Sequence, residues 1–80
     1  MKLLYTNRAR KDIKKLDVQM KLRIKEAVEL LPDGDIKPIQ GYRNLYRLRV
    51  GEYRVIFSYE STDEIMIKTI APRGQVYKHL

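Results

Sequence analysis

The chain has 80 residues, of which 44% are hydrophobic and 34% are charged. This composition is too apolar for a disordered tail, and the length suits one domain, residues 1–80, with one modest core. Lys and Arg number 17 and Asp and Glu 10, which gives a formal net charge of +7. The first partner to consider is therefore nucleic acid, ahead of an acidic protein or an anionic membrane surface.

The same residue inventory excludes several classes of site. There is no cysteine, so disulfides, thiolate metal sites and a cysteine nucleophile are ruled out. The single histidine, His79, cannot build a metal cluster alone, and no Gly-rich phosphate loop or Ser-His-Asp set is present. We expect no metal and no cofactor. No apolar run approaches the roughly 20 residues that span a bilayer, and no signal-peptide core is seen, so we expect a cytoplasmic protein without a membrane partner.

The first elements in chain order are a strand and a helix. Residues 2–6 are rich in strand formers, and Asn7 is a plausible N-cap for a helix over residues 8–16. Within that helix the apolar positions recur at helical spacing: Ala9, Ile13 and Leu16.

A second helix is predicted over residues 18–31, and Asp17 either interrupts the first pattern or caps this helix. Its apolar positions form one stripe: Met20, Ile24, Ala27, Val28 and Leu31. The sequence Pro-Asp-Gly-Asp at residues 32–35 ends it. The segment from there to Gly41 is expected to be an irregular connection.

Three strands are predicted in the second half. From Arg43 to Val50 the apolar and basic residues alternate with a period of two. Gly51-Glu52 is a tight-turn signal, and residues 53–59 and 64–70 form two further strands separated by a turn at residues 61–63. Residues 71–74 break the last strand, and the tail at residues 75–80 is expected to make one helical turn. The predicted fold is α+β, with the order strand-helix-helix-strand-strand-strand and a helical hairpin packed on an antiparallel sheet.

The arginines are concentrated in the predicted sheet. By the period of two, Arg43, Arg47 and Arg49 share one face of a strand, which suits contact with a nucleic acid backbone. A solvated edge that resists aggregation would show the same pattern. Clustered like charges repel, however, and have no evident structural benefit without an anion.

Two more candidates lie further along the chain. Arg54 stands inside an apolar run, where it either pairs with Glu52 or Glu60 or binds a phosphate. Tyr77 lies near Arg73 and Lys78. It either packs on the sheet, stacks on a base, or takes a proton from a ribose 2′-hydroxyl.

These residues resemble a known family. The stretch from Leu45 to Phe57, the Ile-rich strand after it, and Arg73-Gly74-Gln75-Val76-Tyr77 are similar to the second half of RelE/ParE-type toxins of bacterial type II toxin–antitoxin systems. The short strand, the Lys-rich helical hairpin and the connection containing Pro and Gly also fit, so the resemblance covers nearly the whole chain.

The resemblance implies a function as well as a fold. The RelE branch implies a ribosome-dependent mRNA endonuclease that needs no metal and inhibits translation. Its partners would be the ribosome, mRNA and a neutralising antitoxin that is acidic and encoded by the neighbouring gene. Two alternatives remain, a ParE-like toxin that inhibits DNA gyrase without nuclease activity and an inactive toxin-like module that binds nucleic acid.

Residue by residue, the resemblance gives two groups. Leu45 stands where the RelE pattern can carry a lysine, which would reduce the proton-transfer set. The expected catalytic residues are Arg47, Arg54, Arg73 and Tyr77. The expected RNA-binding residues are Arg43, Arg49, Lys68 and Lys78.

Overall fold

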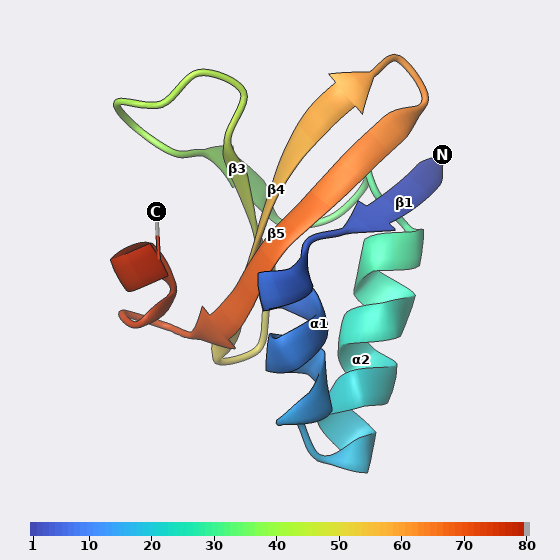
Figure 1. Cartoon of the computed structure of the whole chain (residues 1–80), viewed down its shortest axis with the longest axis vertical. Helices are drawn as coiled ribbons and strands as arrows, with labels where there is room; N and C mark the ends of the chain where they lie inside the picture. Colours follow the sequence, from blue (N-terminus) through green and yellow to red (C-terminus); the bar gives the residue numbers. More distant parts are fainter. Residues whose placement is uncertain (80) are drawn as a thin grey trace.

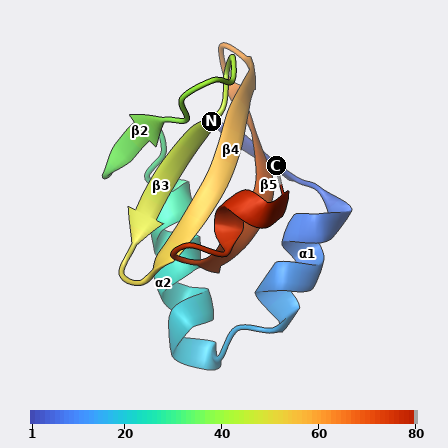
Figure 2. The ribbon, with the colours of Figure 1, turned by 90° about the vertical axis from the view of Figure 1, so that its left-hand side faces the viewer.

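The computed structural model describes residues 1–79, so Leu80, the last residue of the expected tail, lies outside them. A twisted sheet has α1 and α2 on one face and the short helix η1 on the other (Figures 1 and 2). In chain order the elements are β1 (Lys2–Tyr5), α1 (Asn7–Lys14), α2 (Val18–Glu29), β2 (Ile36–Pro38), β3 (Tyr46–Val50), β4 (Tyr53–Ser61), β5 (Glu64–Pro72) and the 3-10 helix η1 (Val76–His79).

The sheet has five strands in the order β1-β5-β4-β3-β2. This confirms the α+β class and the strand-helix-helix order, with two differences. The segment expected to be irregular contains β2, a three-residue edge strand antiparallel to β3. The sheet is also not antiparallel throughout, because β1 pairs with β5 in parallel. A parallel pair needs a long crossover connection, and the intervening chain with both helices supplies it.

The helix boundaries follow from their capping residues. Thr6, and not Asn7, is the N-cap of α1, because its side chain accepts a hydrogen bond from the backbone N–H of Ala9 at 3.0 Å. Asp17 caps α2 by accepting from the N–H of Met20 at 2.8 Å, which confirms the second of the two roles considered for it. Each cap satisfies a backbone donor that the first helical turn leaves free.

The main core lies between the helical hairpin and the sheet. The predicted helical stripes supply part of it, since Ala9, Ile24 and Val28 are at most 3% exposed. The facing side chains come from alternate positions of the strands, except that an irregularity in the pairing of β5 with β4 shifts the pattern between Ile67 and Ile70. They are Leu48, Val50, Val55, Phe57, Ile65, Ile67 and Ile70.

The buried Asp12 fastens α1 to β5 beyond the end of β1. Its Oδ2 accepts hydrogen bonds from the hydroxyl of Thr69 at 2.8 Å and from the backbone N–H of Ile70 at 2.9 Å. Its other oxygen, Oδ1, lies 3.4 Å from Nε of Arg8. The carboxylate therefore accepts from the backbone N–H of Ile70, which β1 is too short to pair.

We expect Asp12→Ala to lower the free energy of unfolding by about 3 kcal/mol, because two buried donors lose their acceptor. Chemical denaturation of the purified protein measures this. The control is Asp33→Ala, which removes an exposed carboxylate and should change stability little. Equal stabilities for the two variants would show that the hydrogen bonds from β5 to Asp12 do not stabilise the fold.

Candidate functional site

The β3–β4 hairpin brings three arginines onto the sheet face opposite the main core. Arg49 lies directly across from Arg54 in the strand register, and Arg47 lies across from Ile56. Arg47 and Arg49 therefore share a face, as their spacing predicts. Opposed cations on neighbouring strands repel, so this arrangement favours a bound anion.

Arg54 is held by the hairpin turn and not by a carboxylate. Its Nη1 donates to the carbonyl oxygens of Gly51 at 3.1 Å and Tyr53 at 3.0 Å, and only 9% of the residue is exposed. Within residues 1–79 no ion pair joins it to Glu52 or Glu60, the two partners considered for it. The bonds fix the guanidinium group while leaving its charge uncompensated.

Arg47 has a distant partner that the sequence did not reveal. Its Nη1 lies 3.9 Å from Oδ1 of Asp35, and that nitrogen is buried without a hydrogen-bond partner. Asp35 reaches this place because its carbonyl accepts from the N–H of Arg49 at 3.0 Å. A buried donor without an acceptor is unfavourable, so Arg47 is suited to receive an anionic oxygen.

The C-terminal segment adds Arg73 and Tyr77. The N–H of Arg73 donates to the carbonyl of Glu52 at 2.8 Å, and Gly74 reverses the chain with a φ of 85°, which suits glycine. The following helix η1 is anchored by Val76, which is fully buried in a small second core with Ile56 and Ala71. This places Tyr77, 45% exposed, beside the arginines.

Together these residues form one depression of about 310 Å³, which we call the arginine site. Its lining includes Tyr77 of η1, the short helix that Figure 2 shows in front of the sheet. Every lining residue is an arginine or a tyrosine: Arg47, Arg49, Arg54, Arg73 and Tyr77. Such a surface offers many charge-assisted hydrogen-bond donors to an anion.

The other three candidate residues do not line the arginine site. Arg43 is not in a strand, because the chain turns at Asn44 with a φ of 55° and β3 begins only at Tyr46. The expected alignment of Arg43 with Arg47 and Arg49 along one strand is therefore wrong. Lys68 is exposed on β5 at an irregularity in its pairing with β4. Lys78 is exposed on η1, next to Tyr77.

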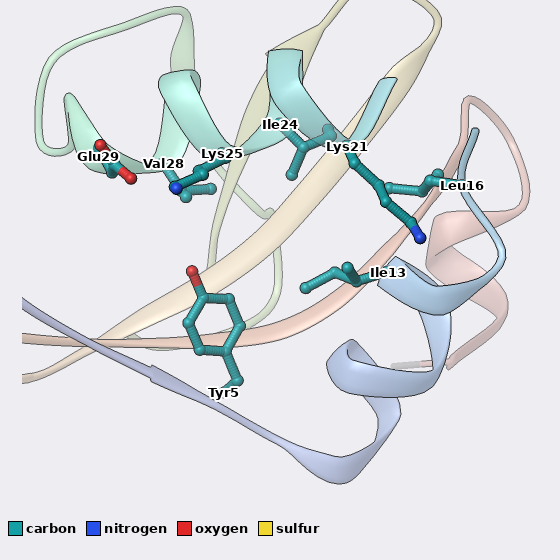
Figure 3. Close-up of a pocket in the computed structure, with 8 residues that line it drawn as sticks. All are labelled: Tyr5, Ile13, Leu16, Lys21, Ile24, Lys25, Val28 and Glu29. Atoms are coloured by element: carbon teal, nitrogen blue, oxygen red, sulfur yellow. The ribbon is translucent and has the colours of Figure 1, made fainter. Parts of the chain in front are cut away.

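A second hollow, which we call the helical groove, lies on the side of the molecule that carries α1 and α2, and Figure 3 shows its lining. It has a volume of about 290 Å³ and is mainly apolar, with charged groups at its rim. Its lining comes from β1, α1, α2 and the connection between the two helices: Tyr5, Ile13, Leu16, Lys21, Ile24, Lys25, Val28 and Glu29. Burial, and then the nearby Glu29 carboxylate, raise the pKa of the Tyr5 hydroxyl above its ordinary value.

Two further features are absent from residues 1–79, a metal site built from several ligands and a membrane-spanning helix. No group of three or more His, Cys, Asp or Glu side chains is placed to hold a metal ion in that part of the chain. No helix there is long and apolar enough to cross a membrane.

Comparisons with known proteins agree on one family. A model of the ParE toxin of the type II toxin–antitoxin system, parDE, matches residues 3–77. Toxin RelE3 of Methanocaldococcus jannaschii is 32% identical, in an alignment that covers 99% of this chain and 98% of that protein.

Solved structures of RelE toxins have the same fold as this chain. The chain resembles one chain in the crystal structure of the RelB–RelE antitoxin–toxin complex from Methanococcus jannaschii. The TM-score is 0.78 and the identity 31%, and the match covers 96% of this chain and 98% of the matched chain. The archaeal RelE–RelB complex from Pyrococcus horikoshii gives a TM-score of 0.71 and 27% identity, covering 94% and 97%. The chain therefore belongs to the RelE/ParE family and is the toxin of a type II toxin–antitoxin pair.

Proposed function

We propose that this toxin is an endoribonuclease that cleaves mRNA on the ribosome, with the arginine site as its active site. One observation carries the proposal. Four arginines and one tyrosine, from β3, β4 and the C-terminal segment, line a single depression that contains no acidic lining residue. That set is suited to a phosphodiester with a neighbouring hydroxyl.

The proposed reaction uses the RNA's own nucleophile. The ribose 2′-hydroxyl attacks the adjacent phosphorus, and the bond from phosphorus to the 5′ oxygen breaks. The products are a 2′,3′-cyclic phosphate and a free 5′-hydroxyl. Tyr77, acting through its phenolate oxygen, takes the proton of the attacking hydroxyl, and the departing 5′ oxygen takes a proton from water. The arginines stabilise the negative charge that builds up on the phosphate oxygens. Charge compensation comes from the side chains, without a metal ion.

Each arginine has a distinct role in this proposal. Arg54 is held rigidly by the turn carbonyls and is aimed at the scissile phosphate. Arg47 offers the buried Nη1 that lacks an acceptor. Arg49 and Arg73 add positive charge to the lining of the arginine site. Outside the depression, the RNA is contacted by Arg43, Lys68 and Lys78.

The direct test uses purified ribosomes translating a defined mRNA. We expect new 5′ ends inside the codon of the ribosomal A site, and no such ends when the same mRNA is incubated without ribosomes. If translation continues and the mRNA stays intact, the endonuclease proposal is wrong.

The ParE-like alternative has a specific observation in its favour, since the matching family model is that of the ParE toxin. It predicts a different order of events in cells. Inhibition of DNA gyrase would produce DNA damage and a supercoiling defect before translation stops. An inactive module would instead bind RNA in a salt-dependent manner without cutting it.

The partner in this proposal is an acidic antitoxin encoded by the neighbouring gene. Its apolar side chains occupy the helical groove, and its carboxylates face Lys21 and Lys25 at the rim of that groove (Figure 3). A further acidic segment covers the arginine site on the other face of the sheet. The antitoxin would then pass around an edge of the toxin and fold as it binds.

Reversing the rim charges should weaken this complex. We expect Lys21→Glu combined with Lys25→Glu to lower antitoxin affinity about tenfold at low salt, with a smaller loss at high salt. Titration calorimetry at two salt concentrations measures both. The control, Lys2→Glu with Lys11→Glu, makes the same change in net charge outside the groove. If both double variants weaken binding equally, only net charge is involved and the groove is not the docking site.

A further inference from the structure

The loop between β2 and β3 carries an exposed aromatic side chain. Tyr42 is 51% exposed, whereas the apolar residues near the loop's two ends, Ile39 and Leu45, pack against buried side chains. Arg43 follows directly and is exposed. The loop therefore presents an aromatic ring beside a guanidinium group to the solvent.

This loop is fixed in place. The side chain of Asn44 acts as a substitute strand partner for Tyr59: its Nδ2 donates to the carbonyl at 2.6 Å, and its Oδ1 accepts from the N–H at 3.0 Å. At the other end, the N–H of Ile39 donates to the carbonyl of Leu45 at 2.9 Å. The ring and the guanidinium group thus stand on a pre-organised base, which reduces the entropy lost on binding.

The same loop packs against the small second core, which also anchors η1 beside the arginine site. Ile39 and Leu45 pack on the small second core of Ile56, Ala71 and Val76, and Val76 is the residue that anchors η1 and hence Tyr77. In Figures 1 and 2 the β2–β3 loop and η1 project from the same side of the sheet. The loop that carries Tyr42 and the helix that carries Tyr77 therefore lie on the same side of the sheet.

We propose that Tyr42 and Arg43 form a nucleobase-stacking subsite that holds an unpaired base of the RNA next to the arginine site. An aromatic face stacks on any base, and a neighbouring cation contacts the phosphate. The subsite rests on the proposed function, since it selects how the RNA strand lies across the depression. It sets the position and base preference of the cut, while the arginine site performs the cut.

The test measures stacking without requiring cleavage. The full-length toxin is titrated into a short single-stranded RNA that contains the fluorescent base 2-aminopurine, and into the same RNA with an abasic ribose at that position. Stacking quenches the fluorescence. We expect Tyr42→Ala to bind the base-containing RNA at least about fivefold more weakly, to bind the abasic RNA as the wild type does, and to lose the quenching. Tyr42→Phe should behave as the wild type.

Control variants separate this subsite from the rest of the molecule. Leu30→Ala removes an exposed apolar side chain from the far end of α2 and should change neither titration. The subsite is disproved if Tyr42→Ala leaves the affinity unchanged, if it weakens both RNAs equally, or if the wild type binds neither RNA. The proposed function fails separately, if the wild type leaves mRNA on ribosomes uncut while the Tyr42 effect on binding is still present.

Discussion

Arg54→Ala is expected to reduce ribosome-dependent mRNA cleavage by about 10²–10³-fold, the usual loss when one pre-organised donor is removed from a developing negative charge. The reason lies in how the side chain is held. Two turn carbonyls fix its Nη1, and no carboxylate neutralises it within the described chain. The guanidinium group can therefore act on the phosphate without first giving up a salt bridge. Rates of mRNA cleavage on purified ribosomes measure the effect.

Matched variants keep this prediction free of folding effects. Arg54→Lys keeps the charge but loses the planar fork of donors, so it should be intermediate in activity. Arg10→Ala removes an exposed arginine from α1 and should be fully active. All variants should still bind the antitoxin, which reports on the fold. Wild-type cleavage by a folded Arg54→Ala protein would remove Arg54 from the active site.

Tyr77→Phe is expected to slow cleavage by about 10²–10⁴-fold, the range attributed to one positioned proton-transfer group. The substitution removes a single oxygen from a half-exposed ring, and Val76, which anchors η1, is untouched. Stability should therefore be unchanged, and the antitoxin should still bind through the helical groove. Single-turnover cleavage on ribosomes, measured beside thermal unfolding, makes the comparison.

The control is Tyr42→Phe, which removes the same oxygen from the other exposed tyrosine and should leave the cleavage rate unchanged. Full activity of Tyr77→Phe would contradict proton transfer by this residue. If Tyr77→Ala were then inactive, the ring would serve to stack on a base. The two substitutions thus distinguish the two functional roles considered for this tyrosine.

Local patterns predicted much of the fold. Helical spacing and capping residues gave both helices to within a few residues, and the period of two with the Gly51 turn gave the β3–β4 hairpin. Features that depend on distant partners were not accessible. The parallel pairing of β1 with β5 joins the first and last strands in chain order. The strand β2 is only three residues long and ends at a proline.

In the candidate site, too, local patterns predicted some features, and those that depend on distant partners were not accessible. Arg47 and Arg49 could be placed on one face because strand geometry fixes it. Arg43 was misplaced because the alternating pattern continues through Asn44, where the backbone in fact turns. The approach of Asp35 to Arg47 depends on β2 lying beside β3, and the anchoring of η1 by Val76 depends on a second core. No pattern in one segment signals either contact.

The 2′-hydroxyl next to the scissile phosphate is the proposed nucleophile, so cleavage at the arginine site requires it. The most direct measurement compares two mRNAs on purified ribosomes that differ only in this hydroxyl, one with ribose and one with deoxyribose at the A-site cleavage position. We expect the wild-type toxin to cleave the first and leave the second intact at that position. Equal cleavage of both, or cleavage of neither, would contradict the proposed mechanism.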